Sequence, residues 1–492
     1  MTPGLAFFYG GLVRRKNVLS LLMQCFMLMC LITMQWALFG YSLAFGPDIK
    51  GIIGSLSWFG LKGVGLAPNP VYAATVPHQA FMIFQAMFAI ITPGLICGAF
   101  AERMKFSTFC IFTLLWATLV YDPVCHWVWG AGGFLKAAGV LDFAGGIVVH
   151  INAGVAALAC ALVLGKRQGY PSKISPPHNL PFAVLGAGLL WFGWFGFNAG
   201  SALTSGALAT SAFVNTQFAG AAAGLTWALL DWIFNSRSTV LGIITGAVGG
   251  LAAVTPASGF ITPIGAIWIG IVVAALCYMA VAILKNKLGY DDSLDAFGVH
   301  GIGGMWGTLA AGLWATKVIN PAGANGFFYG NTAQFFIQLK AVVITSVYSF
   351  VMTFVILKVL NAIIGVRASE QDERIGLDLT QHREAGYTVL EARSGSEGIE
   401  AVRRFGGVVH AAVLDINMPG MDGFAVCTEM RAMRPGIRVL IWSGLDSDGV
   451  RARLKELALD IEVIEKPSRM RDIAVALKRL LTPSEAEQQS VA

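Results

Sequence analysis

The sequence predicts an all-α polytopic membrane protein that ends in a small, partial α/β domain. Of its 492 residues, 56% are hydrophobic and only 13% are charged, and the mean hydropathy is +0.67. A soluble protein could not bury so much apolar surface, so the composition indicates an integral membrane protein. Charged residues are sparse from Met1 to about Gly365 and dense from Arg367 onward. That shift predicts a transmembrane domain over 1–365, followed by a charged C-terminal region.

Apolar runs predict about eleven transmembrane helices. The first run, 3–13, is too short to cross a bilayer, which takes about 20 residues, and it lacks the basic start of a signal peptide. We therefore expect a first helix that is truncated at Met1. Ten longer runs are each long enough to span the membrane: 18–45, 79–101, 106–125, 144–164, 182–203, 211–234, 239–257, 262–284, 298–316 and 335–362.

Basic residues are distributed unevenly among the loops that join these runs. Alternate loops carry Arg14, Arg15, Lys16, Arg103, Lys105, Lys166, Arg167, Lys173, Arg237, Lys285 and Lys287. The intervening loops carry only Lys50, Lys62, Lys136 and Lys317. The positive-inside rule then places the Arg14 loop and the chain after Arg367 in the cytoplasm, in a multi-pass protein of the cell membrane. The net charge of +6 comes mostly from these clusters, so no nucleic-acid partner is expected.

One pattern of residues occurs twice, each time at the start of an apolar run. Residues 142–152 read D-F-A-G-G-I-V-V-H-I-N and residues 295–301 read D-A-F-G-V-H-G, which gives His150 and His300 corresponding places. In the predicted orientation, Asp142 begins its helix from outside and Asp295 begins its helix from inside. Transporters use such an inverted repeat to form a site near the membrane midplane.

Two histidines at membrane depth predict a functional site. A polar ring in the bilayer is costly unless it faces a cavity or a partner. A single histidine in an apolar helix is more often a structural core residue, but two in corresponding positions favour a shared site. We expect the rings of His150 and His300 to face each other, and a pore or carrier is the leading class of protein.

Aromatic residues gather near the predicted outer ends of several helices. They are Phe84, Phe88, Trp127, Trp129 and the stretch 191–198 (W-F-G-W-F-G-F-N), with Ser201 shortly after it. Each one alone fits the ordinary aromatic belt of membrane proteins. Together, aromatic faces around an outer mouth would attract a small cation. The sequence has no acidic ring or carbonyl filter motif, which argues against a permanently charged ion passing intact.

The eight cysteines predict neither a disulfide framework nor a metal site. They lie mostly inside apolar runs, and none forms a C-x-x-C pair. No metal and no cofactor are expected.

The C-terminal region predicts a parallel α/β sheet. Four stretches have the composition of strands: 388–392, 411–415, 438–442 and 462–464. They alternate with amphipathic stretches at 396–405, 421–433, 449–458 and 469–481, which is the pattern of a parallel sheet. We expect this domain to cover 388–482 and a disordered tail to cover 483–492.

A series of longer motifs occurs in order along the first 387 residues. They read T-P-G-L-A-F-F-Y-G-G-L-V-R-R-K-N, F-Q-A-M-F-A-I-I-T, G-A-F-A-E-R-M-K-F, L-D-F-A-G-G-I-V-V-H-I-N-A-G, W-F-G-W-F-G-F-N-A-G-S, D-D-S-L-D-A-F-G-V-H-G-I-G-G and R-I-G-L-D-L-T-Q-H-R-E-A-G-Y. Together they resemble the ammonium transporter family (the Amt/Mep/Rh superfamily). The resemblance implies a homotrimer of eleven-helix subunits, each with its own pore for ammonium or ammonia, and no enzymatic activity. It also implies a cytoplasmic transporter tail over 366–387 and a PII-type regulatory protein as a possible partner at that face.

The resemblance assigns the two histidines and two phenylalanines to the pore. His150 and His300 match the family's twin histidines, and Phe88 and Phe197 match its stacked gate phenylalanines. The energetics fit ammonia as the species inside such a pore. Carrying ammonium intact through hydrocarbon costs about 3 to more than 10 kcal/mol, whereas removing its proton at pH 7 costs about 3–4 kcal/mol. Neutral imidazoles donate and accept hydrogen bonds, so they suit neutral ammonia.

The remaining matched residues lie around that pore. Trp129, Ser201 and Phe84 match the outer site that recruits the cation, and Trp127 is a weaker alternative to Trp129. Asp142, Trp194 and Asn198 receive structural or electrostatic roles, and Asp142 is expected to act on the cation indirectly.

Three short motifs in the tail resemble a response-regulator receiver domain. They are L-D-I-N-M-P-G-M-D-G, S-G at 443–444 and E-K-P at 465–467. The resemblance implies Asp415 as phospho-acceptor, Ser443 as switch hydroxyl and Lys466 as the lysine that binds phosphate. The first strand of a receiver, which carries the acidic pair that holds magnesium, is missing because the transporter tail leads directly into Thr388. We therefore expect an incomplete, inactive receiver.

Three function classes stay open at this point. The chain is an ammonium channel or carrier, an ammonium sensor that signals through its tail in a phosphorelay, or a signalling protein that has lost transport. The intact pore motifs favour the first, and the missing acidic pair counts against the second.

Overall fold

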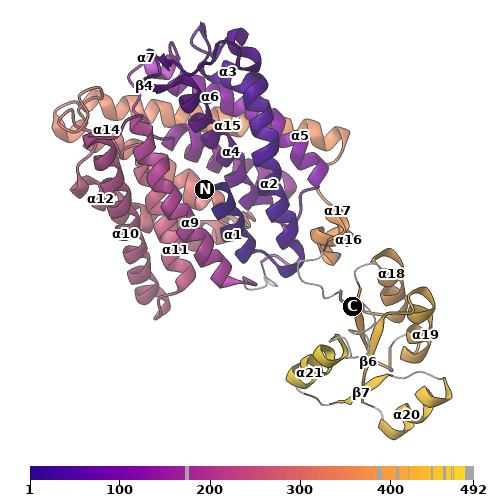
Figure 1. Cartoon of the computed structure of the whole chain (residues 1–492). Helices are drawn as coiled ribbons and strands as arrows, with labels where there is room; N and C mark the ends of the chain where they lie inside the picture. Colours follow the sequence, from indigo (N-terminus) through magenta and orange to yellow (C-terminus); the bar gives the residue numbers. More distant parts are fainter. Residues whose placement is uncertain are drawn as a thin grey trace. The chain divides into compact units, whose positions relative to one another are not determined.

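The structure, a computed structural model, describes residues 1–171, 177–384, 390–405, 409–418, 420–444, 447–457, 461–466, 468 and 470–481. The chain divides into two compact units, Met1–Leu377 and Asp378–Ala492 (Figure 1). The first unit is built almost entirely of helices, and the second contains a small sheet. Each unit is described by itself.

The helices of the first unit follow the predicted runs. Helix α1 (Thr2–Leu12) corresponds to the short first run. The ten longer runs correspond to α2 (Val18–Gln35) with η2 (Trp36–Gly40) and α3 (Tyr41–Phe45), α4 (His78–Phe100), α5 (Phe106–Trp116) with η4 (Ala117–Tyr121) and α6 (Asp122–Trp129), η5 (Gly146–Ile151) with α8 (Asn152–Leu164), α9 (Leu180–Ala199), α10 (Ala207–Asn235), α11 (Val240–Val254), α12 (Pro263–Tyr278) with η7 (Met279–Leu284) and α13 (Lys285–Leu288), η8 (Phe297–Gly301) with α14 (Ile302–Trp314), and α15 (Thr332–Ile363). The predicted spans are therefore confirmed as helical. Seven of these helical stretches are long and apolar enough to cross a membrane, and α11 is a shorter apolar helix.

Five of the long helices contain a π-helical turn, namely η2, η4, η5, η7 and η8. A π-helical turn holds one extra residue and widens the helix locally, and such turns are frequent at functional sites. His150 lies in η5 and His300 lies in η8. The two predicted site residues thus occupy corresponding distortions of their helices.

Loops that carry the predicted cytoplasmic charges meet at one end of the first unit. Arg14 pairs with Glu102 at 2.8 Å, and Arg167 pairs with Asp291 at 2.8 Å and with Glu102 at 3.4 Å. Burial alone would raise the pKa of Glu102, but the charges of Arg14 and Arg167 outweigh it and lower that pKa below its ordinary value. The pKa of Asp291 is also lowered, since hydrogen bonds from Arg167 and the charge of Arg103 outweigh its burial. Both carboxyl groups are therefore held in the charged form.

The segment after α15 attaches to the same loops. Arg367 pairs with Glu373 at 2.5 Å and donates hydrogen bonds to the carbonyl oxygens of Leu164 and Lys166. The backbone N–H of Leu377 donates to Asn17 Oδ1 at 2.9 Å. Loops from both halves of the sequence and the end of the first unit therefore lie together.

The sheet of the second unit is parallel. Strands β5 (Ala411–Leu414), β6 (Arg438–Ser443) and β7 (Glu462–Glu465) pair in the order β5-β6-β7. The helices of this unit are α18 (Gly395–Phe405), α19 (Gly423–Met433), α20 (Ser447–Glu456) and α21 (Met470–Leu481). Three of the four predicted strands and all four predicted helices are confirmed. Of the fourth predicted strand, Thr388 and Val389 lie outside the described residues, and 390–392 are not in a strand.

The residues just before this sheet are helical. Helices α16 (Glu370–Ile375) and α17 (Leu377–His382) occupy the stretch that would have to supply a replacement for the missing first strand. A strand over 375–379, which would have restored a complete receiver sheet, is therefore not formed.

Candidate functional site

The rings of His150 and His300 lie side by side in the interior of the first unit. Their centroids are 5.3 Å apart and their planes differ by only 11°. Both side chains are buried, at 1% and 3% exposure. Three ring nitrogens, His150 Nδ1, His150 Nε2 and His300 Nδ1, have no hydrogen-bond partner among the described residues. Buried polar groups normally have partners, so this pair is suited to bind a small polar molecule.

A carboxylate eight residues before each histidine organises the start of each helix. Asp142 Oδ1 accepts hydrogen bonds from the N–H groups of Gly145 and Gly146, and Oδ2 accepts from those of Ile147 and Val148, over 2.7–3.2 Å. These four donors take up the lone pairs that face the helix start. Asp142 therefore stabilises the helix start.

The matching carboxylate in the second half is Asp292, not Asp295 as the sequence pattern suggested. Asp292 accepts from the N–H groups of Ala296 and Phe297 at 3.1 and 2.8 Å. Asp295 has a left-handed backbone, with φ at 59°, and its carboxylate pairs with Lys285. The equal spacing of eight residues from Asp142 to His150 and from Asp292 to His300 is the signal in the sequence that could have identified this pair.

Phe88 and Phe197 lie against each other in a tilted arrangement, and the Phe197 ring centroid is 6.2 Å from that of His150. The ring centroids of Phe88 and Phe197 are 4.2 Å apart and their planes differ by 31°. Phe88 also contacts Trp129 edge to face at 5.6 Å and Phe84 at 5.0 Å. The structure therefore joins the predicted gate to two of the three predicted recruitment residues.

Trp194 packs against His150 from another side. The two rings are nearly parallel, with centroids 5.5 Å apart. The indole Nε1–H of Trp194 donates to Thr255 Oγ1 at 2.9 Å, which fixes the plane of the indole. Thr255 is the residue directly after α11, and it holds the indole of Trp194 in place. The sequence analysis missed this role, because no motif in the sequence marks it.

The other predicted residues lie at different distances from this cluster. Ser201 Oγ donates to the carbonyl of Phe197 at 2.9 Å, just beyond the gate. Asn198 is buried, and its Nδ2 donates to Thr216 at 2.9 Å, so it joins α9 to α10. Trp127 packs instead against Phe134 and Tyr348, with centroids 5.1 and 4.6 Å away. Of the two tryptophans, Trp129 is the one that contacts Phe88.

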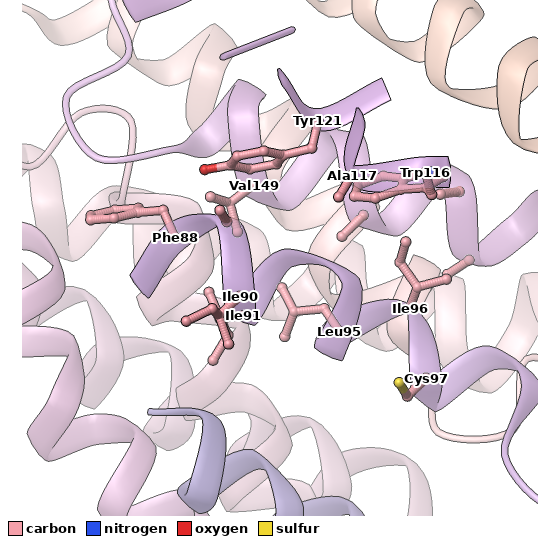
Figure 2. Close-up of a cluster of buried hydrophobic side chains, with 14 of the residues drawn as sticks. Phe88, Ile90, Ile91, Leu95, Ile96, Cys97, Trp116, Ala117, Tyr121 and Val149 are labelled. Carbon is pink, nitrogen blue, oxygen red and sulfur yellow. The ribbon is translucent and has the colours of Figure 1, made fainter. Parts of the chain in front are cut away.

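A narrow apolar cavity holds the two histidines. It has a volume of about 10 Å³, and its lining includes Ile91, Leu95 and Val149 besides the histidines, Trp194 and Phe197. Figure 2 shows Ile91 and Leu95 of α4 below both Phe88 and Val149. A volume of this size accommodates about one water-sized molecule. Beyond His300 a wider cavity of about 340 Å³ begins, with Arg14, Glu102 and Asp295 in its wall.

In the second unit, Asp415 and Lys466 form a direct ion pair. Lys466 Nζ lies 2.5 Å from Asp415 Oδ2 and 4.6 Å from the centroid of the Trp442 ring. Ser443 is buried, and its carbonyl accepts a hydrogen bond from the Lys466 backbone N–H at 2.7 Å. Within the described part of the chain, no cluster of three or more His, Cys, Asp or Glu side chains could hold a metal ion. The residues around Asp415 therefore do not fit the magnesium ion of a receiver.

Comparison with known sequences identifies the family. The profile described as the Ammonium Transporter Family matches residues 1–387. The chain belongs to the ammonium transporter family. Members of this family are membrane transporters and not enzymes. The profile of the response regulator receiver domain matches residues 371–478, so both profiles cover 371–387.

Individual family members agree with this assignment. The ammonium transporter of Bacillus subtilis (strain 168) is 54% identical over 387 residues, which cover 79% of this chain and 95% of that relative. The crystal structure of Candida albicans Mep2 is 36% identical, has a TM-score of 0.73, and matches over 80% of this chain and 90% of that chain. A structure described as "Sensor Amt Protein" is 29% identical, has a TM-score of 0.72, and matches over 77% of this chain and 94% of that chain.

Proposed function

We propose that this chain carries ammonium across the cell membrane as ammonia, after deprotonation at the outer end of the pore. The observation that carries the proposal is the pair of nearly parallel imidazoles in an apolar cavity of about 10 Å³, which is also lined by Phe197, the partner of Phe88. A cavity of that size and polarity suits one small neutral molecule and not a hydrated ion.

Recruitment takes place at the outer aromatic site. The ring of Trp129 and the nearby ring of Phe84 offer π faces to the cation, and Ser201 offers a hydroxyl oxygen. Asp142 adds negative charge, and the N–H donors around it keep the carboxylate away from direct contact. The Trp129 indole Nε1–H donates to the carbonyl of Asp142 at 2.9 Å, which ties the aromatic site to the helix start.

Passage then depends on the two histidines. Once ammonium has given its proton to water at the outer mouth, ammonia moves between Phe88 and Phe197. It then meets ring nitrogens that have no hydrogen-bond partner among the described residues. Each imidazole can donate to or accept from ammonia, which compensates for the lost hydration. Potassium has no proton to lose and no hydrogen bond to donate, so it would be excluded.

The remaining features of the proposal concern the whole transporter. We propose a homotrimer with one pore per subunit and a cytoplasmic C-terminus. The convergence of the basic loops at one end of the first unit supports a single cytoplasmic face. That face would be the surface for a PII-type regulatory protein.

The test uses the full chain reconstituted in proteoliposomes. An inward ammonium gradient should drive uptake of ammonium into the proteoliposomes. An inward potassium gradient of the same concentration should give no uptake of potassium. Replacing both histidines (His150→Leu with His300→Leu) should lower uptake about tenfold or more, since two hydrogen bonds of about 1 kcal/mol each are lost. A wild-type protein that is folded and inserted but shows no ammonium-dependent signal would refute the proposal.

A second candidate function is ammonium sensing through the fused second unit. It is favoured by that unit itself and by the likeness to the structure described as "Sensor Amt Protein". A chain ending at residue 384 should transport ammonium like the full chain if transport is the main function. Loss of an ammonium-dependent cellular response with intact uptake would instead favour sensing.

A further inference from the structure

We infer that Gly154 and Gly304 are positioning residues that set the spacing of the two histidines. The inference rests on the proposed function, because it concerns the same pore. Each glycine lies four residues after a histidine, Gly154 after His150 and Gly304 after His300. Each one also lies against the backbone of the opposite half, next to the opposite histidine.

Gly154 makes the closer of the two contacts. A Cβ atom at this position would lie 2.1 Å from the backbone nitrogen of Gly301, 2.3 Å from its Cα and 3.0 Å from the carbonyl carbon of His300. The obstructing atoms are backbone atoms, so a side-chain rotation cannot relieve the contact. Any larger residue at 154 must push η8, and His300 with it, away from α8.

Gly304 makes the reciprocal contact. A Cβ atom there would lie 2.8 Å from the backbone nitrogen of Ile151, and 2.9 Å from both the carbonyl oxygen of Gly146 and the Cβ of His150. Two of these three atoms are again backbone atoms, here of η5. Gly154 of the first half thus contacts η8 of the second half, and Gly304 of the second half contacts η5 of the first half. An inverted repeat would produce such a reciprocal pair of contacts.

The consequence is a fixed distance between the imidazoles. The rings can lie 5.3 Å apart only because the helix backbones that carry them touch without intervening side chains. Small residues allow such close approach throughout membrane proteins. Here both contacts lie next to the histidines, so the distance between the imidazoles depends on how closely the two helices cross.

The experiment compares four alanine variants of the full chain in proteoliposomes. Gly154→Ala and Gly304→Ala change the two crossings at the histidines. Gly270→Ala is the matched control, because its Cβ would lie 2.4 Å from the carbonyl oxygen of Ala219, at a contact between α12 and α10 that includes neither histidine. Gly188→Ala is the open control, since nothing lies within 4 Å of its Cβ position.

Two quantities are measured for each variant: the uptake of ammonium per folded protein, and the ratio of methylammonium to ammonium uptake. A displacement of about 1 Å at a reacting pair can cost up to about a hundredfold in rate. We expect ammonium uptake to fall about tenfold or more in Gly154→Ala and less in Gly304→Ala, in the order of their contact distances. We also expect the ratio to rise in both, because separated rings leave room for the methyl group.

The controls separate spacing from general packing. Gly270→Ala should lower the yield or melting temperature but leave the ratio at its wild-type value, and Gly188→Ala should change neither. The inference is overturned if the ratio is unchanged in both pore variants, or moves equally in Gly270→Ala. It is also overturned if both pore variants fail to insert while Gly270→Ala inserts, since the glycines then serve folding. A wild-type protein without uptake would instead count against the proposed function.

Discussion

Asp142 accepts more hydrogen bonds from the backbone than any other residue of the site, and its removal should be correspondingly costly. In Asp142→Asn, one of the two carboxylate oxygens becomes an NH₂ group that faces the N–H donors of Ile147 and Val148. Hydrogen bonds to a charged group contribute about 1.5–3 kcal/mol each, so the loss of two should lower stability by about 3–6 kcal/mol. Uptake should fall with it, because η5 carries His150. Thermal unfolding in detergent and uptake in proteoliposomes check both effects.

Asp292→Asn is the matched control for this prediction. Asp292 accepts only two backbone N–H groups, so one hydrogen bond is lost where Asp142→Asn loses two. We expect about half the loss of stability. Equal losses in the two variants would show that the number of hydrogen bonds does not govern the helix start.

At the scale of single residues, the sequence was enough to predict which side chains belong to the site, but not which residues they contact. His150 and His300 were predicted from their places in two apolar runs, since a buried imidazole is unusual enough to be noticed. Asp295 was taken as the counterpart of Asp142 because its neighbours resemble those of Asp142, but its backbone is left-handed and its carboxylate pairs with Lys285. Thr255 was missed because a threonine after an apolar helix has no distinguishing pattern, and its role depends on a contact with a distant helix.

At the scale of elements, apolar runs were sufficient to predict the helices, because each of the ten longer runs is long enough to cross a bilayer. The π-helical turns were not predictable in the same way. A π turn is selected by contacts on both sides of the helix, and Gly146–Ile151 has no local feature that excludes an ordinary α-helix. The strands of the second unit were predicted from short apolar runs. Their parallel direction was predicted because a helical stretch lies between each strand and the next.

The loop network that joins these elements predicts a characteristic acid sensitivity. Glu102 and Asp291 have pKa values lowered in the folded state. Their stabilisation is fully present above the ordinary carboxyl pKa of about 4 and is lost as the pH falls through the lowered folded values. We expect the contribution of these groups to the melting temperature to be constant from pH 7 to about 5 and to decrease below about pH 4. Thermal unfolding across this range measures it.

Asp291→Asn tests the cause of that acid sensitivity. It removes the charge of a buried carboxylate and leaves the partly buried guanidinium of Arg167 without its closest partner, which should cost about 3–5 kcal/mol at neutral pH. The acid decrease should then be shallower, because one of the two titrating groups is gone. If the melting temperature of this variant decreases below about pH 4 as steeply as that of the wild type, Asp291 does not contribute to the acid sensitivity.

At the scale of the whole molecule, the proposed orientation makes a direct prediction. Lys136 should react with a membrane-impermeant amine reagent added outside intact cells, whereas Lys166 should react only after the cells are opened. The physical reason is the excess of basic residues in the loops that meet around Arg14 and Arg167. Lys136→Arg provides the control for the outer signal. Labelling of Lys166 from outside would reverse the proposed topology.

The second unit should not accept a phosphoryl group. Phosphoryl transfer to an aspartate needs a metal ion to stabilise the charge on the moving group. In this chain Lys466 already contacts Asp415, and the described residues supply no acidic cluster for magnesium. We expect no stable phosphate on Asp415 after incubation with acetyl phosphate and magnesium. The amount of protein-bound phosphate should equal that of the Asp415→Asn variant. An acid-labile, magnesium-dependent phosphate that disappears in Asp415→Asn would contradict this expectation.

The ring nitrogens of His150 and His300 that have no hydrogen-bond partner among the described residues also have a consequence for the evolution of such a chain. There are three such nitrogens in the described part of the chain, and an unsatisfied buried polar atom costs about 1–3 kcal/mol. Native proteins are stable by only about 5–15 kcal/mol, so selection for folding alone would replace both rings by leucine or phenylalanine. Gene copies released from the need to take up nitrogen should therefore drift toward apolar residues at these two positions. Their products should melt at higher temperatures than the active transporter.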